Sequence, residues 1–250
     1  MARKHVLILA SGGGSNAEAL VKYANKNALN IDFACASDKL KEEAGVYNRM
    51  AGFGVRTDHV PMPGKNFALL RALLQNPKSY NRAYPKKFDL VLMAGFMRIL
   101  PPDIVKNNTV LNIHPSILPY VYVGSKDAYQ DALNNGDLRT GCTVHIATAD
   151  VDMGPVLAQI GFEIPKPVIE NKDIDALRAI GLAHEHVLYP AVMHAVLYQK
   201  LDNLNMIDLV GKARMLLAER NLQGIMNGYA TIAPPGNYQR KFSSWNARGI

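Results

Sequence analysis

Three polar residues, an amide, an imidazole and a carboxylate, have the types and the order of a group that could act on a reacting carbonyl. Asn112 and His114 end the apolar run 110–114, and Asp152 follows later in a Gly-Pro-containing segment. An apolar run that stops at polar side chains predicts a buried strand. Because residues i and i+2 of a strand point to the same side, we expect Asn112 and His114 to converge.

This trio would suit a reaction in which a carbonyl oxygen gains negative charge. The amide of Asn112 can donate to such an oxygen, and the imidazolium of His114 can donate both charge and a proton. The carboxylate of Asp152 is a candidate for holding the ring protonated. The residues alone also allow a structural interpretation, in which His114 caps a strand, Asn112 binds backbone and Asp152 sits in a turn.

The elements that would position these residues alternate between strand and helix. Apolar runs predict strands over 5–10, 31–37, 55–60, 89–93 and 110–114, and helical spacing predicts helices over 17–25, 42–52, 67–74 and 128–134. This order predicts a doubly wound, mostly parallel α/β sheet, with ligands at the carboxyl ends of its strands. Runs over 140–149 and 156–164 predict an antiparallel extension. A long helical stretch over 173–200 contains Pro190, which predicts a kink or two helices.

A glycine loop separates the first predicted strand from the first predicted helix. Its sequence is Ser11-Gly12-Gly13-Gly14-Ser15-Asn16. Glycines allow a close approach of backbone to an anion, and the N–H groups at a helix start favour a phosphate. The loop lacks the Lys-Ser/Thr pair of a P-loop and the full dinucleotide spacing, so a plain tight turn is the alternative.

Composition limits the function classes. The chain has 250 residues, 48% of them hydrophobic, and a formal net charge of +7, which suits an anionic substrate. Lys and Arg are scattered, so nucleic-acid binding is not favoured. We expect Cys35 and Cys142 to be buried reduced thiols, and without a Cys/His cluster we expect no metal. No stretch has the length of a membrane span, which predicts a soluble, cytoplasmic protein without a membrane partner. The sequence leaves a homodimer open.

Several separated motifs occur in the order of a known family. The segments Asn112–Ser116, Leu118-Pro119 and Asp152–Pro155, with the glycine loop before them, resemble the folate-dependent formyltransferases. The resemblance extends from about Lys4 to about Lys200. It implies a Rossmann-like formyltransferase domain over residues 1–200. Residues 201–250 are then a C-terminal extension, partly helical over 204–219, to which we assign no function.

The resemblance also implies an activity. The formyl group of 10-formyltetrahydrofolate, as co-substrate, would pass to the amino group of glycinamide ribonucleotide in purine (IMP) biosynthesis, with Asn112, His114 and Asp152 as catalytic residues. The loop residues Gly14, Ser15 and Asn16 would bind the phosphate of the ribonucleotide. Glu185 would bind its sugar hydroxyls or its amine end, with a solvated helix charge as the alternative.

Two segments are implied to line the folate pocket. They consist of Met97, Arg98, Ile99 and Leu100 after the fourth predicted strand, and of Thr148, Ala149, Asp150 and Val151 before Asp152. An apolar slot with a few backbone donors and acceptors is what a flat heterocycle requires. From spacing alone, Met97, Ile99 and Leu100 are core residues.

The segment Tyr120–Asp127 departs from the nearest family pattern and is about two residues longer. Because this loop borders the acceptor site in the family, it leaves a formyltetrahydrofolate deformylase open as an enzyme alternative. The basic net charge leaves a methionyl-tRNA formyltransferase open as a second, less favoured one. A binding module that kept the fold is the non-enzymatic alternative, against which the intact Asn112, His114 and Asp152 argue. His145 is expected to be a satisfied sheet histidine or a group near the folate.

Overall fold

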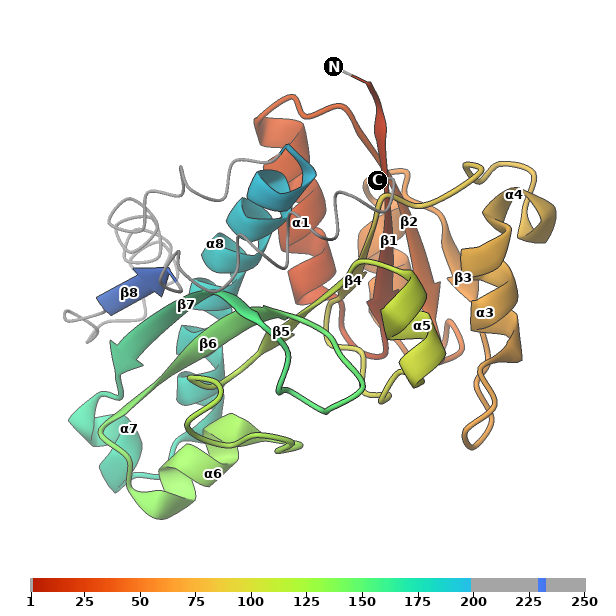
Figure 1. The fold of residues 1–250 in the computed structure, drawn as a ribbon. Coiled ribbons are helices and arrows are strands. Elements are labelled where there is room, and N and C mark those ends of the chain that lie inside the picture. The colour runs from red at the N-terminus through yellow and green to blue at the C-terminus, as the bar shows by residue number, and fades with distance from the viewer. Residues whose placement is uncertain (1, 199–228, 233–250) are drawn as a thin grey trace. The chain divides into compact units, whose positions relative to one another are not determined.

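The computed structural model describes residues 2–198 and 229–232 (Figure 1). These residues form two compact units. The first contains the chain up to Ile113 together with Ala147–Val151, and the second contains His114–Ile146 and the described residues from Asp152 onward. The chain therefore passes from one unit to the other inside a single strand, directly before His114.

The first unit is a parallel sheet with helical crossovers. Its elements are β1 (Lys4–Ala10), α1 (Ser15–Lys26), β2 (Ile31–Ser37), α2 (Val46–Ala51), β3 (Thr57–His59), α3 (Ala68–Gln75), α4 (Pro77–Tyr80), β4 (Leu90–Met93), α5 (Pro102–Asn107) and β5 (Val110–His114), which ends one residue beyond the unit. The strands pair in parallel in the order β3-β2-β1-β4-β5. Strand order reverses beside β1, which is the arrangement of a doubly wound sheet.

Both faces of this sheet are buried. On one face, Leu7 and Leu9 of β1 belong to the same core cluster as residues of α3 and α5, among them Leu70 and Ile104. The alternate residues of β1, such as Ile8, point to the other face and are equally inaccessible to solvent. A parallel sheet needs such cover on both faces because its strands are apolar on both sides.

The predicted strands of the first unit are confirmed, and the helices differ in detail. Helix α2 is shorter than the predicted 42–52, since residues before Val46 form turns. Helices α4 and α5 were not predicted. Each has a proline at its first position, where the missing N–H costs no helical hydrogen bond.

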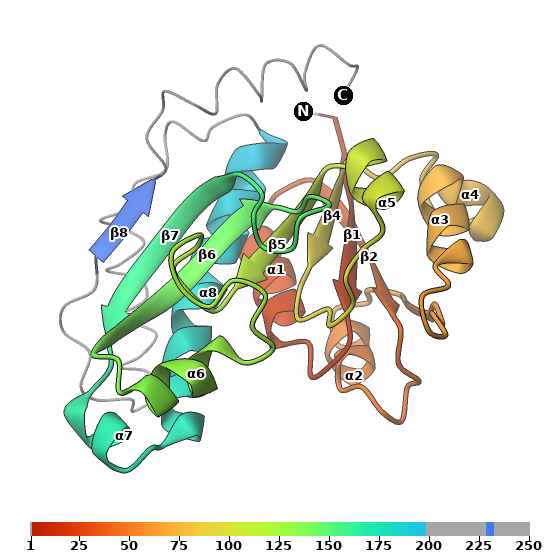
Figure 2. The same cartoon turned by 60° about the horizontal axis from the view of Figure 1, so that its bottom comes forward.

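The second unit is built on antiparallel strands. Its elements are α6 (Ala128–Asn135), β6 (Arg139–Ile146), β7 (Val156–Glu163), α7 (Lys166–Glu170), α8 (Ile174–Leu197) and β8 (Tyr229–Ile232). Strands β6 and β7 pair side by side in antiparallel register, as Figure 2 shows, and β8 pairs with β7. Together with the parallel sheet of the first unit, these strands confirm the predicted α/β class with an antiparallel extension.

Helices α6 and α8 share a core with β7. Tyr129 of α6, Phe162 of β7 and Ile180 of α8 belong to one buried cluster, and Phe162 stacks on the ring of His184 with 4.3 Å between ring centroids. Helix α8 runs as one helix through Pro190, so of the two predicted alternatives, a kink or two helices, the second is wrong. The residues around Pro190 are buried, and their packing holds the helix together where one backbone hydrogen bond is missing.

Most of the segment 201–250 and the helix predicted over 204–219 lie outside the described residues. Strand β8 is the described part of that segment, and a strand there was not predicted. The domain boundary near residue 200 stays a prediction. Among the described helices, none has the length and apolar character needed to cross a membrane.

Candidate functional site

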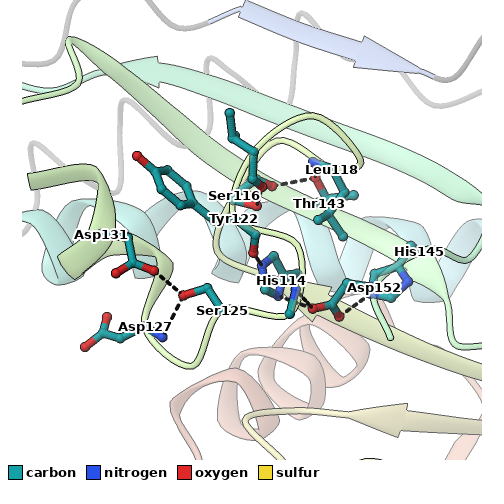
Figure 3. Close-up of polar contacts among 12 residues, drawn as sticks. His114, Ser116, Leu118, Tyr122, Ser125, Asp127, Asp131, Thr143, His145 and Asp152 are labelled. Carbon is teal, nitrogen blue, oxygen red and sulfur yellow. Dashed lines mark hydrogen bonds and ion pairs between the residues drawn. The ribbon is translucent and has the colours of Figure 1, made fainter. Parts of the chain in front are cut away.

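The end of β5 places His114 in a buried pocket of hydrogen-bond acceptors. Its ring Nδ1 lies 3.3 Å from Oδ2 of Asp152, and its Nε2 lies 3.0 Å from the backbone carbonyl of Tyr122 (Figure 3). A carbonyl only accepts, so Nε2 is the nitrogen that donates there. The predicted pairing of His114 with Asp152 is therefore present, although the two residues are far apart in the sequence.

Asp152 is held in place from several directions. Its backbone has a φ of 55°, a left-handed conformation that Asp adopts more readily than most residues. Its Oδ2 accepts the backbone N–H of Gly124 at 3.0 Å, and its Oδ1 lies 3.6 Å from Nε2 of His145. A register shift at Val144/His145 interrupts the β6–β7 ladder, and such irregularities re-aim a side chain.

The segment after β5 is fixed by one buried hydroxyl. Thr143 of β6 donates from Oγ1 to the carbonyl of Ser116 at 2.6 Å and accepts the N–H of Leu118 at 3.1 Å. The hydroxyl of Ser116 in turn donates to the carbonyl of Val121 at 2.7 Å. These bonds set the start of the Tyr120–Asp127 loop and so the position of the Tyr122 carbonyl.

The far side of the Tyr120–Asp127 loop is tied to the surface of the second unit. The hydroxyl of Tyr122 donates to Asp137. The hydroxyl of Ser125 donates to Asp131 at 2.5 Å (Figure 3). Tyr122 itself has a left-handed φ of 57°. The loop thus forms a defined turn, whose backbone contacts both members of the His114–Asp152 pair.

Two opposing effects act on the pKa of His114. Burial disfavours the charged ring and is the larger effect, whereas the Asp152 carboxylate and the Tyr122 carbonyl favour it. The pKa is lowered from 6.5 as a result. The expected attraction by Asp152 exists, but it offsets the effect of burial only in part.

The second histidine beside Asp152, His145, has a more strongly lowered pKa. Burial lowers the pKa of His145 to about 4, despite the raising effect of Asp152. At neutral pH the ring of His145 is therefore uncharged. Its position in β6 agrees with a sheet histidine, and its distance to Asp152 makes it a neighbour of the pair.

Asn112 lies in β5 two residues before His114 and is half-buried. Its backbone pairs in register with Met93 of β4. Side chains at this spacing leave a strand on the same side. The convergence of the amide and the imidazole on one substrate atom stays a prediction.

Glu185 is a buried carboxylate of α8. Only 6% of the residue is exposed, so its interpretation as a solvated helix charge is wrong. Its Oε1 accepts the hydroxyl of Tyr129 at 3.0 Å, across the contact between α8 and α6. A carboxylate that is buried and oriented in this way has the properties of a binding group.

The glycine loop of the first unit forms the start of α1. Gly14 is the residue before the helix, with a φ of 77°, and its carbonyl accepts the N–H of Glu18 at 2.9 Å. A Cβ at Gly14 would lie 2.7 Å from the side chain of Val46, so glycine is required there for two reasons. Ser15 is half-buried and Asn16 is buried in the first turn of the helix.

The predicted folate segment after β4 divides into two kinds of residue. Met97 and Ile99 are 69% and 68% exposed, which is unusual for large apolar side chains, whereas Leu100 belongs to the core. Arg98 is used structurally, since its Nε donates to the buried carboxylate of Asp38 at 2.8 Å. Leu100 thus fits the core interpretation, and Met97 and Ile99 do not.

The second predicted folate segment is a surface loop of the same unit. Thr148 donates to the carbonyl of Asp150 at 3.0 Å, and Ala149, Asp150 and Val151 are exposed. Ala147, directly before it, packs against the core cluster that contains Leu100. The start of the loop is therefore packed against the core, and its end is exposed to solvent.

Several residues of these regions had no signal in the sequence. The partners Tyr122 and Gly124 act through backbone atoms, which residue type does not reveal. Asp38 and Tyr129 contact Arg98 and Glu185 over long sequence separations. The left-handed turn at Gly124 is the one feature that a Gly in an altered loop could have indicated. Among the described residues, no group of three His, Cys, Asp or Glu side chains could hold a metal ion.

Comparison with known proteins adds an independent line of evidence. The formyl transferase family matches residues 4–193. A phosphoribosylglycinamide formyltransferase of Escherichia coli is 32% identical over 197 residues, which cover 76% of this chain and 85% of that protein. A trifunctional purine biosynthetic protein adenosine-3 of Chironomus tentans is 31% identical over 78% of this chain, which spans 14% of that longer protein.

Solved structures agree with the sequence comparison. The crystal structure of a phosphoribosylglycinamide formyltransferase from Anaplasma phagocytophilum superimposes with a TM-score of 0.67 at 29% identity, over 80% of this chain and 89% of that one. The matched family covers both the glycine loop and the His114–Asp152 pair. The chain belongs to the formyl transferase family.

Proposed function

We propose that the protein transfers the formyl group of 10-formyltetrahydrofolate to the amino group of glycinamide ribonucleotide, a step of purine biosynthesis. The observation that carries the proposal is the buried His114–Asp152 pair at the end of a strand that also contains Asn112. The similarity to the phosphoribosylglycinamide formyltransferase of Escherichia coli supports this choice of acceptor.

The reaction begins with attack of the neutral amine on the formyl carbon. A C–N bond forms, and the electron pair of the carbonyl moves to its oxygen. Asn112 donates a hydrogen bond to this oxyanion, and His114 donates from its ring, so that two positioned donors stabilise the developing charge. Collapse of the intermediate breaks the bond from the formyl carbon to N10 of the folate. The proton lost by the amine ends on that nitrogen, moved by His114, Asp152 or a water between them.

The geometry of His114 indicates which nitrogen acts. Nδ1 faces Asp152, and Nε2 donates to the carbonyl of Tyr122. In the proposed reaction the formyl oxygen takes the place of that carbonyl as the acceptor. Because burial lowers the pKa of His114, the charged form that the oxyanion needs depends on the Asp152 carboxylate.

The two substrates are assigned to separate groups of residues. Gly14, Ser15 and Asn16 bind the phosphate of the ribonucleotide through backbone and side-chain donors at the start of α1, and Glu185 binds its sugar or its amine. The exposed apolar side chains of Met97 and Ile99, with backbone groups of 148–151, bind the folate heterocycle. That these groups form one pocket is part of the proposal. The cytoplasmic location stays a prediction, and a homodimer stays open.

A turnover assay with and without the acceptor tests the proposal. Mixed with 10-formyltetrahydrofolate alone, the enzyme should release little tetrahydrofolate, and addition of glycinamide ribonucleotide should start rapid turnover. Rapid release without any amine acceptor would make the deformylase the better assignment. A matched reaction with methionyl-tRNA as the acceptor should give no formylation.

A further inference from the structure

The glycine loop is held from outside by helix α2, through contacts that lie entirely within the first unit. The backbone N–H of Val46 donates to the carbonyl of Gly12 at 3.2 Å. Nε of Arg49, one turn further along α2, donates to the carbonyl of Gly13 at 2.7 Å. Residues of one helix thus donate hydrogen bonds to two successive peptide carbonyls of the loop and fix their orientation.

These contacts determine where the loop N–H groups point. In a planar trans peptide the C=O and the following N–H point in opposite directions. With the carbonyls of Gly12 and Gly13 turned toward α2, the N–H groups of Gly13 and Gly14 point away from it. Gly12 and Gly13 are exposed, and a Cβ on either would meet nothing within 4 Å. The loop therefore offers consecutive donors on an open side, the arrangement that binds anions.

Arg49 also acts on the charge at the start of α1. Its Nη1 forms an ion pair with Glu18, whose other oxygen lies 2.6 Å from Nζ of Lys22. Glu18 stands in the first turn of α1, where its negative charge would repel a phosphate. Lys22, and then Arg49, favour the ionised carboxyl strongly enough to lower its pKa despite some burial. Both cations also neutralise its field.

We propose that Arg49 is a positioning residue for the phosphate of the substrate, because it orients the Gly13–Gly14 peptide. The inference rests on the proposed function of the glycine loop. The inference assigns different roles to Arg49 and Lys22. Both cations pair with Glu18, but only Arg49 donates to the backbone of the loop. The planar fork of a guanidinium can hold the Gly13 carbonyl and the Glu18 carboxylate at once, which an ammonium does less well.

The test compares Arg49→Gln with the matched variant Lys22→Gln. Each removes one positive charge and one partner of Glu18. Arg49→Gln should raise KM for the ribonucleotide about tenfold, the cost of roughly one charge-assisted hydrogen bond. Its kcat and its KM for the folate should stay near those of the parent. Lys22→Gln should change all three constants by less than about twofold. Equal effects of the two variants on the ribonucleotide KM would overturn the inference.

Inorganic phosphate provides a second readout that does not depend on turnover. Titration of the full chain by calorimetry should give a weaker dissociation constant for Arg49→Gln than for Lys22→Gln. Arg49→Lys keeps the charge without the fork and should bind phosphate almost as weakly as Arg49→Gln. Full recovery in Arg49→Lys would assign the effect to charge and contradict the positioning role. If the parent binds phosphate with this pattern but formylates no ribonucleotide, the proposed function fails while the inference about Arg49 holds.

Discussion

The glycine loop of the first unit and the His114–Asp152 pair of the second use different kinds of chemical group. The loop offers backbone groups, and its residues Gly12 and Gly13 are exposed. The pair consists of side chains that are 6% and 10% exposed and are fixed by the carbonyl of Tyr122 and the N–H of Gly124. Electrostatic interactions are stronger where water is excluded. We therefore expect the buried pair to control kcat and the open loop to control affinity for the ribonucleotide.

The largest expected effect is that of Asp152→Asn. The variant removes the carboxylate that raises the pKa of His114, so the charged ring becomes rarer when the oxyanion forms. We expect kcat to fall by at least roughly a hundredfold with KM little changed, as for an interaction confined to the transition state. Steady-state kinetics with both substrates measure this.

The asparagine is chosen because it keeps the local structure. It can still accept the N–H of Gly124, and it tolerates the left-handed backbone at position 152. Asp175→Asn, in the first turn of α8, removes the same charge from an exposed site and should leave kcat unchanged. Near-normal turnover of Asp152→Asn would remove Asp152 from the mechanism.

Ser15→Asp tests the other side of the comparison. A carboxylate at the start of α1 would repel the phosphate, so KM for the ribonucleotide should rise about tenfold or more. The KM for 10-formyltetrahydrofolate should stay near its parent value, and Ser15→Ala, which adds no charge, should have a smaller effect. Equal increases of KM for both substrates would mean that the loop does not discriminate between them.

Tyr129→Phe should have a smaller effect on affinity. It removes the hydroxyl that donates to Oε1 of Glu185 but keeps the aromatic packing against Phe162. Loss of one such hydrogen bond corresponds to about 1 kcal/mol, so KM for the ribonucleotide should rise about fivefold while kcat changes little. If kcat falls instead, Glu185 acts in the chemical step and belongs with the buried pair.

The smallest effect on activity is expected at His184, a buried histidine whose Nδ1 lies 2.9 Å from the backbone carbonyl of Ile180. Burial lowers its pKa to about 4, below that of an unfolded histidine. The unfolded chain therefore binds more protons, and about 3 kcal/mol of stability, present above pH 6.5, is lost as the pH falls toward 4. In urea unfolding, His184→Leu should flatten this dependence and leave kcat unchanged. An unaltered pH dependence of stability would show that His184 does not titrate as proposed.

Much of the first unit could be predicted because its signals are local. The strand over 31–37 has the predicted bounds, since an apolar run and the polar residues around it define a buried strand. The glycine loop between β1 and α1 was found for the same reason. Helix α5 was missed, although proline at the first position of a helix, here Pro102, is favourable.

The His114–Asp152 pair was predicted from residue types and motif order, but its surroundings were not. The contacts of Tyr122 and Gly124 depend on backbone conformations at Tyr122 and Asp152 that residues other than glycine rarely adopt. No periodicity encodes them. The lowered pKa of His114 was missed as well, because burial of the ring follows from the packed loop and not from the motif.

The pH dependence of kcat/KM in the parent and in Asp152→Asn tests most directly whether His114 and Asp152 handle the proton. The reaction needs a charged His114 ring and a neutral substrate amine. Between the two pKa values, a rise in pH lowers the fraction of charged rings as much as it raises the fraction of neutral amine, so the rate stays constant. The parent should show a bell with an acid limb below the ordinary histidine value of 6.5 and a basic limb near that of an amine, about 8. In Asp152→Asn the plateau should drop and the acid limb should move to lower pH, because the carboxylate no longer raises the pKa of His114. A variant profile that is lower but has the same acid limb would contradict the account.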